Sequence, residues 1–165
     1  MGLGKIFCIL GGILALIGTL FFSFYSFELL PGVTEVGFGI GLFMNFGAIF
    51  ESADILAIVL CILYAISVIS GLFILIGAKS RVIAIIGSIF ALLLGILLLV
   101  RFGLEINLGF DISNSLLYFW ATPIIDGIIP FDLPLGLGSI SLGTILLIGG
   151  GVLGLIGGIM GTSDF

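Results

Sequence analysis

Acidic side chains are the residues of this chain whose type and spacing best suit binding or catalysis. All Asp and Glu residues except Asp164 lie in two stretches between apolar runs: Glu28, Glu35, Glu51, Asp54, Glu105, Asp111, Asp126 and Asp132. Carboxylate oxygens bind divalent cations, and alternating segments would bring Glu35, Glu105 and Asp111 onto neighbouring strands. We interpret the set as a solvated acidic surface, with cation bridging as the alternative, and predict no metal site.

Residues for other kinds of chemistry are missing from the sequence. The chain has no histidine, which excludes haem ligation by His, His-based zinc sites and Ser-His or Cys-His catalysis. It has no Walker loop and no Cys-x-x-Cys motif. No ionisable residue lies in the middle of an apolar run, where ion-coupled transporters usually carry one. We therefore predict a protein that is not an enzyme and holds no cofactor.

Four apolar runs must position the acidic stretches. Of the 165 residues, 61% are hydrophobic and 8% are charged, too apolar a composition for a water-soluble fold. The runs cover about residues 6–27, 55–78, 82–100 and 140–160, each close to the ~20 residues that cross a bilayer as a helix. The first lacks a small-x-small cleavage site and is predicted to be a retained helix. We expect a single membrane domain over 1–165, with outer loops at 28–54 and 101–139.

Basic residues predict the orientation of this domain. Lys5 precedes the first run, and Lys79 and Arg81 lie between the second and third, which places these positions and both termini in the cytoplasm. The expected location is the cell membrane, as a multi-pass protein. Arg101 is the single basic residue on the outer side, and we interpret it as an interfacial anchor that pairs with Glu105, or with Glu51 and Asp54.

Small residues recur within the apolar runs at helical spacing. They are Gly150, Gly154 and Gly158, with Gly157 and Gly161 beside them, Gly87, Ala91 and Gly95, Gly11 and Gly18, and Ser67 and Gly71. Membrane helices associate through close packing at such positions. Packing among the four helices of one chain is the first interpretation. The second adds an oligomer interface along Gly150, Gly154 and Gly158.

Alternation of period two marks three outer segments, which is the pattern of a sheet with one apolar face. The segments are "EVGFGIGLF", "LEINLGFDIS" and "DLPLGLGSIS". We predict a small antiparallel β-sheet formed by the two outer loops, with Pro134 at its edge and with Gly39 and Gly109 on a flat face that contacts another subunit. An irregular apolar loop lying on the lipid headgroups is the alternative.

A short helix is predicted between the second and third of these segments. Asp111, Ser113 or Asn114 would cap it, and it would carry Tyr118 and Trp120 before Pro123. Tyr and Trp suit the membrane interface, so both are predicted to be interfacial anchors. Binding of a protein partner by these rings is the alternative.

The predicted architecture is an all-α membrane protein, a four-transmembrane-helix bundle with a small outer sheet. It resembles the tetraspan topology of claudins and the related peripheral-myelin and MARVEL-type proteins. The resemblance covers the whole chain as topology, whereas the Trp and Cys-Cys signature of claudins is absent from "ELLPGVTEVGFGIGLFMNFGAIFES". It implies a membrane fold and assigns no functional residue.

The function that we expect is that of a non-enzymatic membrane scaffold or accessory subunit. Glycine-rich helix faces and outer strands would assemble it laterally with copies of itself or with other membrane protein subunits. Its expected partners are the lipid bilayer and these subunits. No nucleic-acid partner is expected. The alternatives are an oligomeric pore or transport subunit with an acidic outer vestibule, and a structural subunit of a larger membrane enzyme complex.

Overall fold

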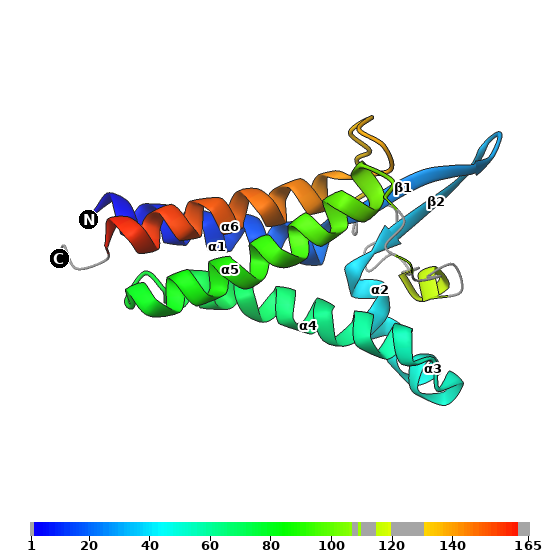
Figure 1. The fold of residues 1–165 in the computed structure, drawn as a ribbon, viewed down its shortest axis with the longest axis horizontal. Coiled ribbons are helices and arrows are strands. Elements are labelled where there is room, and N and C mark those ends of the chain that lie inside the picture. Colours follow the sequence, from blue (N-terminus) through cyan, green and yellow to red (C-terminus); the bar gives the residue numbers. More distant parts are fainter. Residues whose placement is uncertain (1, 107–108, 110–114, 120–130, 162–165) are drawn as a thin grey trace.

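A computed structural model describes residues 2–106, 109, 115–119 and 131–161 of the chain. Four helices in it are long and apolar enough to cross a membrane: α1 (Leu3–Phe21), α4 (Ile55–Ile76), α5 (Arg81–Leu98) and α6 (Leu142–Met160). They form a bundle in which the start of α1, the end of α6 and the α4–α5 turn lie at one end (Figure 1). The sequence-based prediction of four helices that are long and apolar enough to span a membrane is confirmed.

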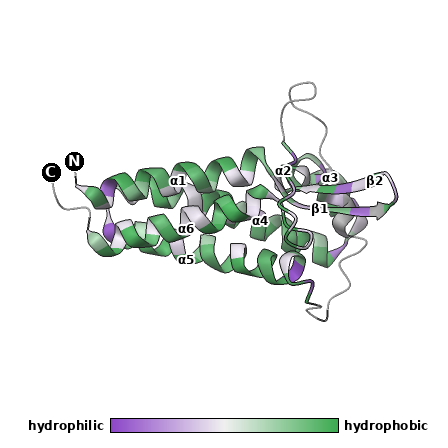
Figure 2. Ribbon diagram, turned by 90° about the horizontal axis from the view of Figure 1, so that it is seen from above, coloured by the Kyte–Doolittle hydropathy of each residue, from purple (hydrophilic) through white to green (hydrophobic). Residues whose placement is uncertain are grey.

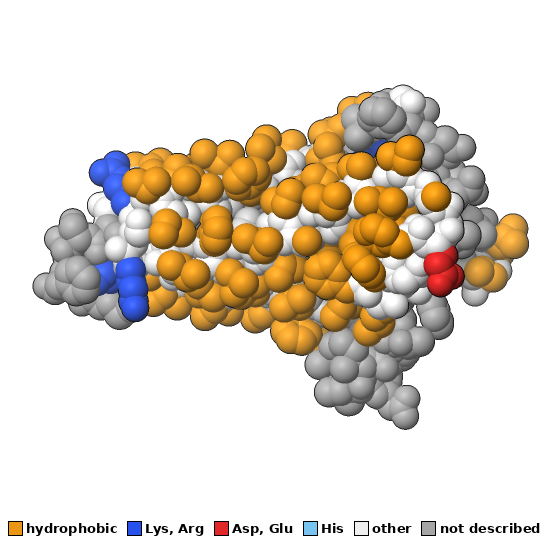
Figure 3. Space-filling view, turned by 90° about the horizontal axis from the view of Figure 1, so that it is seen from below, with side chains coloured by type: hydrophobic (Ala, Val, Ile, Leu, Met, Phe, Trp, Pro, Cys, Tyr) orange, Lys and Arg blue, Asp and Glu red, His pale blue; other side chains and the backbone are white. Residues whose placement is uncertain are grey.

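Charged residues lie at the two ends of this bundle. The helices are hydrophobic along most of their length (Figure 2). Lys and Arg side chains gather mainly at the end that holds the termini, and Asp and Glu at the opposite end, which we call the crown end (Figure 3). A bilayer can therefore surround the apolar middle of the bundle while both charged ends remain in water.

The first helix is shorter than its predicted range of 6–27, because it ends at Phe21. Strand β1 (Ser23–Leu30) follows after one residue and pairs with the antiparallel strand β2 (Val33–Phe38). The start of β1, "SFYSF", combines aromatic residues with serines, and aromatic residues favour strands although they also make this stretch as apolar as part of a membrane helix. A Pro31-Gly32 turn joins the two strands, with Gly32 at φ 84°.

The predicted sheet is wrong in its strands, although a small antiparallel sheet is present. Both strands belong to the first half of the chain, and "EVGFGIGLF" is a strand only up to Phe38, after which α2 (Gly39–Met44) begins. The described residues 103–106 of the second segment form no strand, and residues 107–108 and 110–114 lie outside the described residues. The third segment makes only isolated bridges, Tyr25 with Ile140 and Pro134 with Ser141.

Short elements complete the crown, by which we mean β1, β2, α2, α3 (Phe46–Ser52) and η2 (Ser115–Phe119). Helix α5 extends towards it through one π-helical turn, η1 (Leu99–Gly103). Tyr25 joins these parts, because its ring stacks 4.4 Å from that of Phe102 and meets that of Phe119 at 5.5 Å. The crown therefore has an aromatic core of its own, continuous with the outer end of the bundle.

Hydrogen bonds fix the crown to the start of α4. The Asp54 carboxylate accepts from the backbone N–H groups of Leu56 and Ala57, at 3.0 and 3.3 Å, and thereby caps the helix. Its second oxygen accepts from the Ser115 hydroxyl at 2.9 Å. One carboxylate thus begins a membrane-spanning helix and holds η2 beside it.

Candidate functional site

The glycines predicted to form an oligomer interface on α6 lie inside the bundle. A Cβ added at Gly150 would be 2.5 Å from the carbonyl oxygen of Gly11, and one at Gly154 would be 2.5 Å from Ser88 Oγ. At Gly158 an added Cβ would be 2.8 Å from Ile85 of α5. These three glycines therefore serve packing within one chain, the first of the two interpretations.

The contact between α1 and α6 repeats every seven residues. Gly4, Gly11 and Gly18 of α1 face Gly157, Gly150 and Gly143 of α6, in antiparallel order. In each pair, an added Cβ on either glycine would lie between 2.5 and 2.9 Å from the carbonyl oxygen of the other. Such closeness permits Cα–H···O contacts along the whole interface. The heptad spacing in both helices is the sequence signal of this contact.

Gly39 and Gly109, the predicted outer interface residues, lie in different surroundings. Gly39 is buried at the start of α2, where an added Cβ would collide with the rings of Tyr64 and Phe24. Gly109 is exposed and has φ 80°, a conformation that favours glycine, with no atom within 4 Å of an added Cβ. The structure therefore does not place Gly39 on a flat outer face.

The predicted interfacial aromatic residues are described only in part. Tyr118 is half-buried in η2, and its carbonyl oxygen accepts a hydrogen bond from the Asn45 side chain at 3.1 Å. Trp120 lies outside the described residues. The interfacial role of both rings stays a prediction.

Arg101 lacks the ion pair that the sequence predicted. It is half-buried on η1, and its guanidinium carbon lies 5.5 Å from the ring centroid of Phe102. Its buried Nε atom has no hydrogen-bond partner, and no carboxylate of the described residues forms an ion pair with it. Asp54 binds backbone N–H groups and Ser115 instead. The expected pairing with Glu51, Asp54 or Glu105 is absent from the described structure, and Asp111 and Asp126 lie outside the described residues.

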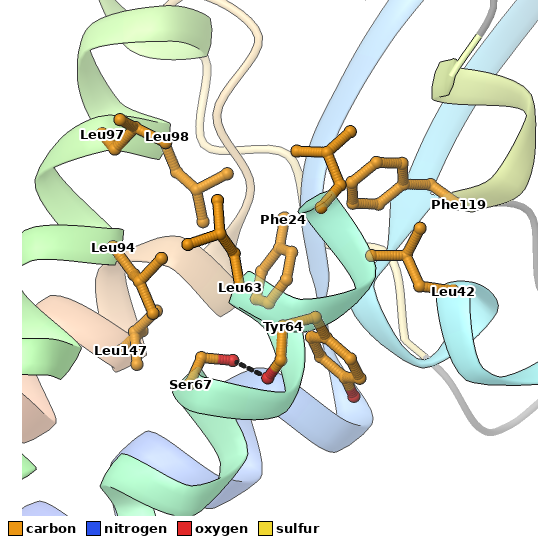
Figure 4. Close-up of a pocket in the computed structure, with 11 residues that line it drawn as sticks. Phe24, Leu42, Leu63, Tyr64, Ser67, Leu94, Leu97, Leu98, Phe119 and Leu147 are labelled. Carbon is orange, nitrogen blue, oxygen red and sulfur yellow. Dashed lines mark hydrogen bonds between the residues drawn. The ribbon is translucent and has the colours of Figure 1, made fainter. Parts of the chain in front are cut away.

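An apolar pocket lies between the outer halves of α4 and α5, below the crown. It has a volume of about 40 Å³ and is drawn in Figure 4. The lining residues come from α4, α5, α6 and the crown: Leu60, Leu63, Tyr64, Ser67, Leu94, Leu97, Leu98, Leu147, Phe24, Leu42 and Phe119. Leu97 is 44% exposed, so the pocket reaches the outer surface of the bundle.

The polar groups in the pocket wall are already hydrogen-bonded within the chain. The Tyr64 hydroxyl donates to the carbonyl oxygen of Thr19 at 2.9 Å, and the Ser67 hydroxyl donates to that of Tyr64 at 2.6 Å. The pocket therefore offers an apolar ligand a complementary surface and offers a polar ligand no free partner. Sequence reasoning missed it because its leucines look like any others in a membrane helix.

A second edge of β1 is tied to the segment that precedes α6. The backbone N–H of Ser26 donates to Ser139, and that of Ser141 donates to Phe24, at 2.8 and 3.1 Å. The Asp132 carboxylate accepts from the hydroxyls of Ser23 and Ser26, at 2.7 and 3.2 Å. This structural role of Asp132 was not predicted. Among the described residues no group of three Asp, Glu, His or Cys side chains could hold a metal ion, and Asp111 lies outside them.

The far end of the hairpin remains uncovered. It extends away from the bundle, and its tip carries Leu30 and Val33, which are 61% and 50% exposed (Figure 1). In the described part of the chain, β2 pairs with β1 alone, so the second edge of β2 has no strand partner among the described residues. An apolar tip beside an open strand edge is typical of a surface that contacts another chain.

Comparison of the chain with protein-family models, with curated proteins and with solved structures gave no match. None of these comparisons tests the resemblance to claudins, which stays a prediction from the sequence.

Proposed function

We propose that the protein is a non-enzymatic membrane scaffold or accessory subunit, which assembles laterally through the β1–β2 hairpin. The exposed apolar tip of this hairpin, Leu30 and Val33, is the observation that carries the proposal. Exposed leucine and valine outside the bundle gain free energy when another chain covers them. The open edge of β2 can add backbone hydrogen bonds to the same contact.

Two further observations favour the hairpin over the helix faces as the assembly surface. The glycines of α6 at 150, 154 and 158 are covered by α1, α4 and α5 of the same chain. Described carboxylates that contact the crown, such as Asp54 and Asp132, are used in hydrogen bonds that hold the fold. Helix α3 also exposes Phe46 and Phe50, at 50% and 52%, and their rings contact each other at 4.5 Å. The hairpin tip differs from α3 because its exposed apolar side chains adjoin a strand that has one strand partner among the described residues.

The test compares oligomeric state in mild detergent and in lipid nanodiscs. We expect the wild-type protein to form oligomers, or to copurify with other membrane proteins from native membranes, and the double variant Leu30→Asp, Val33→Asp to lose both. Leu137→Asp is the matched control, because Leu137 is 62% exposed in a different segment. A wild-type protein that is monomeric in both media and copurifies with nothing would overturn the proposal.

A further inference from the structure

We propose that the pocket between α4 and α5 binds an acyl chain of one phospholipid and that Arg101 binds the phosphate of the same molecule. The site would hold a lipid of the leaflet on the crown side. This inference is independent of hairpin assembly, since it uses other residues and another ligand.

The wall of the pocket specifies the apolar half of the ligand. Its leucine and phenylalanine side chains surround a space that Leu97 leaves accessible from the side of the bundle. Since the polar groups of Tyr64 and Ser67 are satisfied internally, water in this space would find no partner. In a membrane, the molecule that meets such an opening is a hydrocarbon chain.

The shape of the opening favours an acyl chain over a complete helix of another subunit. Towards the inner end, α4 and α5 touch: a Cβ added at Gly87 would lie 2.7 Å from Phe73 Cβ and 2.8 Å from the carbonyl oxygen of Ser70. Towards the crown the two helices diverge (Figure 1). Phe24, Leu42 and Phe119 contribute crown side chains to the wall. The space is therefore closed along its inner part, where a helix crossing the membrane would need room.

Arg101 specifies the polar half of the ligand. It follows Leu97 by four residues, so it lies about 6 Å further out on the same side of the helix. It carries a buried Nε atom without a partner, and no described carboxylate neutralises its charge. A guanidinium group matches the geometry of a phosphate and binds it by two parallel hydrogen bonds. The spacing places an anion where the headgroup of a lipid would lie if its chain entered the pocket.

The polar and apolar features are separate observations that agree on one ligand. An apolar pocket alone would accept any hydrocarbon, and an arginine that pairs with no described carboxylate would, by itself, accept any anion. The distance of one helical turn between them fits a molecule that joins a phosphate to a hydrocarbon chain. The π-turn η1 carries Arg101, and such turns occur frequently at functional sites.

The experiment counts lipids bound to the purified full-length protein by native mass spectrometry, with dioleoyl phosphatidylglycerol, dioleoylglycerol and inorganic phosphate as probes. We expect one phosphatidylglycerol per chain, and about tenfold lower occupancy for Arg101→Gln because a charge-assisted hydrogen bond is lost. Arg101→Lys should restore part of the binding. Leu63→Phe, which fills the pocket, should also reduce it. Dioleoylglycerol and inorganic phosphate should each bind much more weakly.

Controls separate this site from general lipid coating and from misfolding. Leu93→Phe adds the same bulk to an exposed position of α5, and Arg81→Gln removes a charge at the opposite end, so both should keep wild-type occupancy. All variants should elute as the wild type does in size-exclusion chromatography. Equal occupancy in wild type and Arg101→Gln would overturn the phosphate contact, and equal occupancy in Leu63→Phe would overturn the chain site. A disulfide between two copies carrying Leu97→Cys, with no bound lipid, would assign the opening to a second chain instead.

Failure of the hairpin proposal and failure of the lipid-site proposal give different experimental results. The hairpin variant Leu30→Asp, Val33→Asp should keep its lipid, and Arg101→Gln should keep the oligomeric state.

Discussion

Gly11 of α1 and Gly150 of α6 face each other without room for a methyl group on either. A Cβ added at Gly11 would lie 2.6 Å from the carbonyl oxygen of Gly150, and one added at Gly150 would lie 2.5 Å from that of Gly11. Membrane helices gain little from burying apolar surface against one another, so backbone closeness of this kind supplies much of their association. The α1–α6 pair is accordingly the most extensive interhelical contact in the described structure.

The substitution Gly150→Ala should destabilise the bundle by about 1–3 kcal/mol, because the added methyl group forces the two helices apart. Gly149→Ala is the matched control, since an added Cβ at Gly149 meets no atom within 4 Å. Alanine there should leave stability unchanged or raise it by up to about 1 kcal/mol through helix propensity. Thermal unfolding in detergent measures both effects. Equal stability of the two variants would contradict this account of the α1–α6 contact.

The substitution Asp132→Ala should loosen the attachment of the 131–141 segment to β1. It removes the acceptor of both serine hydroxyls, at an expected cost of about 1 kcal/mol in local stability. The backbone N–H groups of Ser23 and Phe131, which bond across this junction, should then exchange with deuterium about fivefold faster. Glu51→Ala, an exposed carboxylate on α3, should leave these rates unchanged. Unaltered exchange in Asp132→Ala would show that the backbone bonds hold the junction alone.

The Tyr25 phenol should make the crown sensitive to alkaline pH. Burial raises the pKa of Tyr25 above its ordinary value, and the negative charge of Glu35 raises it further. The folded protein thus holds this proton more tightly than the unfolded chain, in which the phenol titrates near about pH 10. The stability due to the phenol is complete below that pH and falls above it, by about 1.4 kcal/mol per pH unit.

Thermal unfolding between pH 8 and pH 11 tests this dependence. Tyr25→Phe should keep the ring contacts with Phe102 and Phe119 and lose less stability at pH 11 than the wild type. Tyr118→Phe, which removes a phenol from η2 and leaves Tyr25 in place, is the matched control variant. Identical pH profiles for Tyr25→Phe and the wild type would rule out Tyr25 as the cause.

Hydropathy was sufficient to predict the four helices that are long and apolar enough to span a membrane. A run of about 20 apolar residues matches the thickness of the bilayer core when it is helical. Hydropathy failed at the end of α1, since Phe22, Phe24 and Phe27 are as apolar in a strand as in a helix. Alternation was also ambiguous in the 35–43 segment. There Gly39 begins a helix, and the rings of Tyr64 and Phe24 occupy the space that a side chain at this position would need. The local sequence does not reveal this contact between distant parts of the chain.

Of the candidate site, the sequence singled out only Arg101, which was interpreted as an interfacial anchor paired with a carboxylate. The pocket was not predictable, because leucines that line it and leucines that face lipid occur at the same helical spacing. Its position depends on how far α4 and α5 diverge, which follows from the close approach at Gly87 and from the crown side chains in its wall.

A single residue, Phe22, separates α1 from the hairpin, and Ser141, whose backbone N–H donates to Phe24, immediately precedes α6. The hairpin is therefore attached to both α1 and α6, the helix pair with the most extensive contact in the described structure. A chain that binds the hairpin tip would be connected through these two attachments to both helices at once.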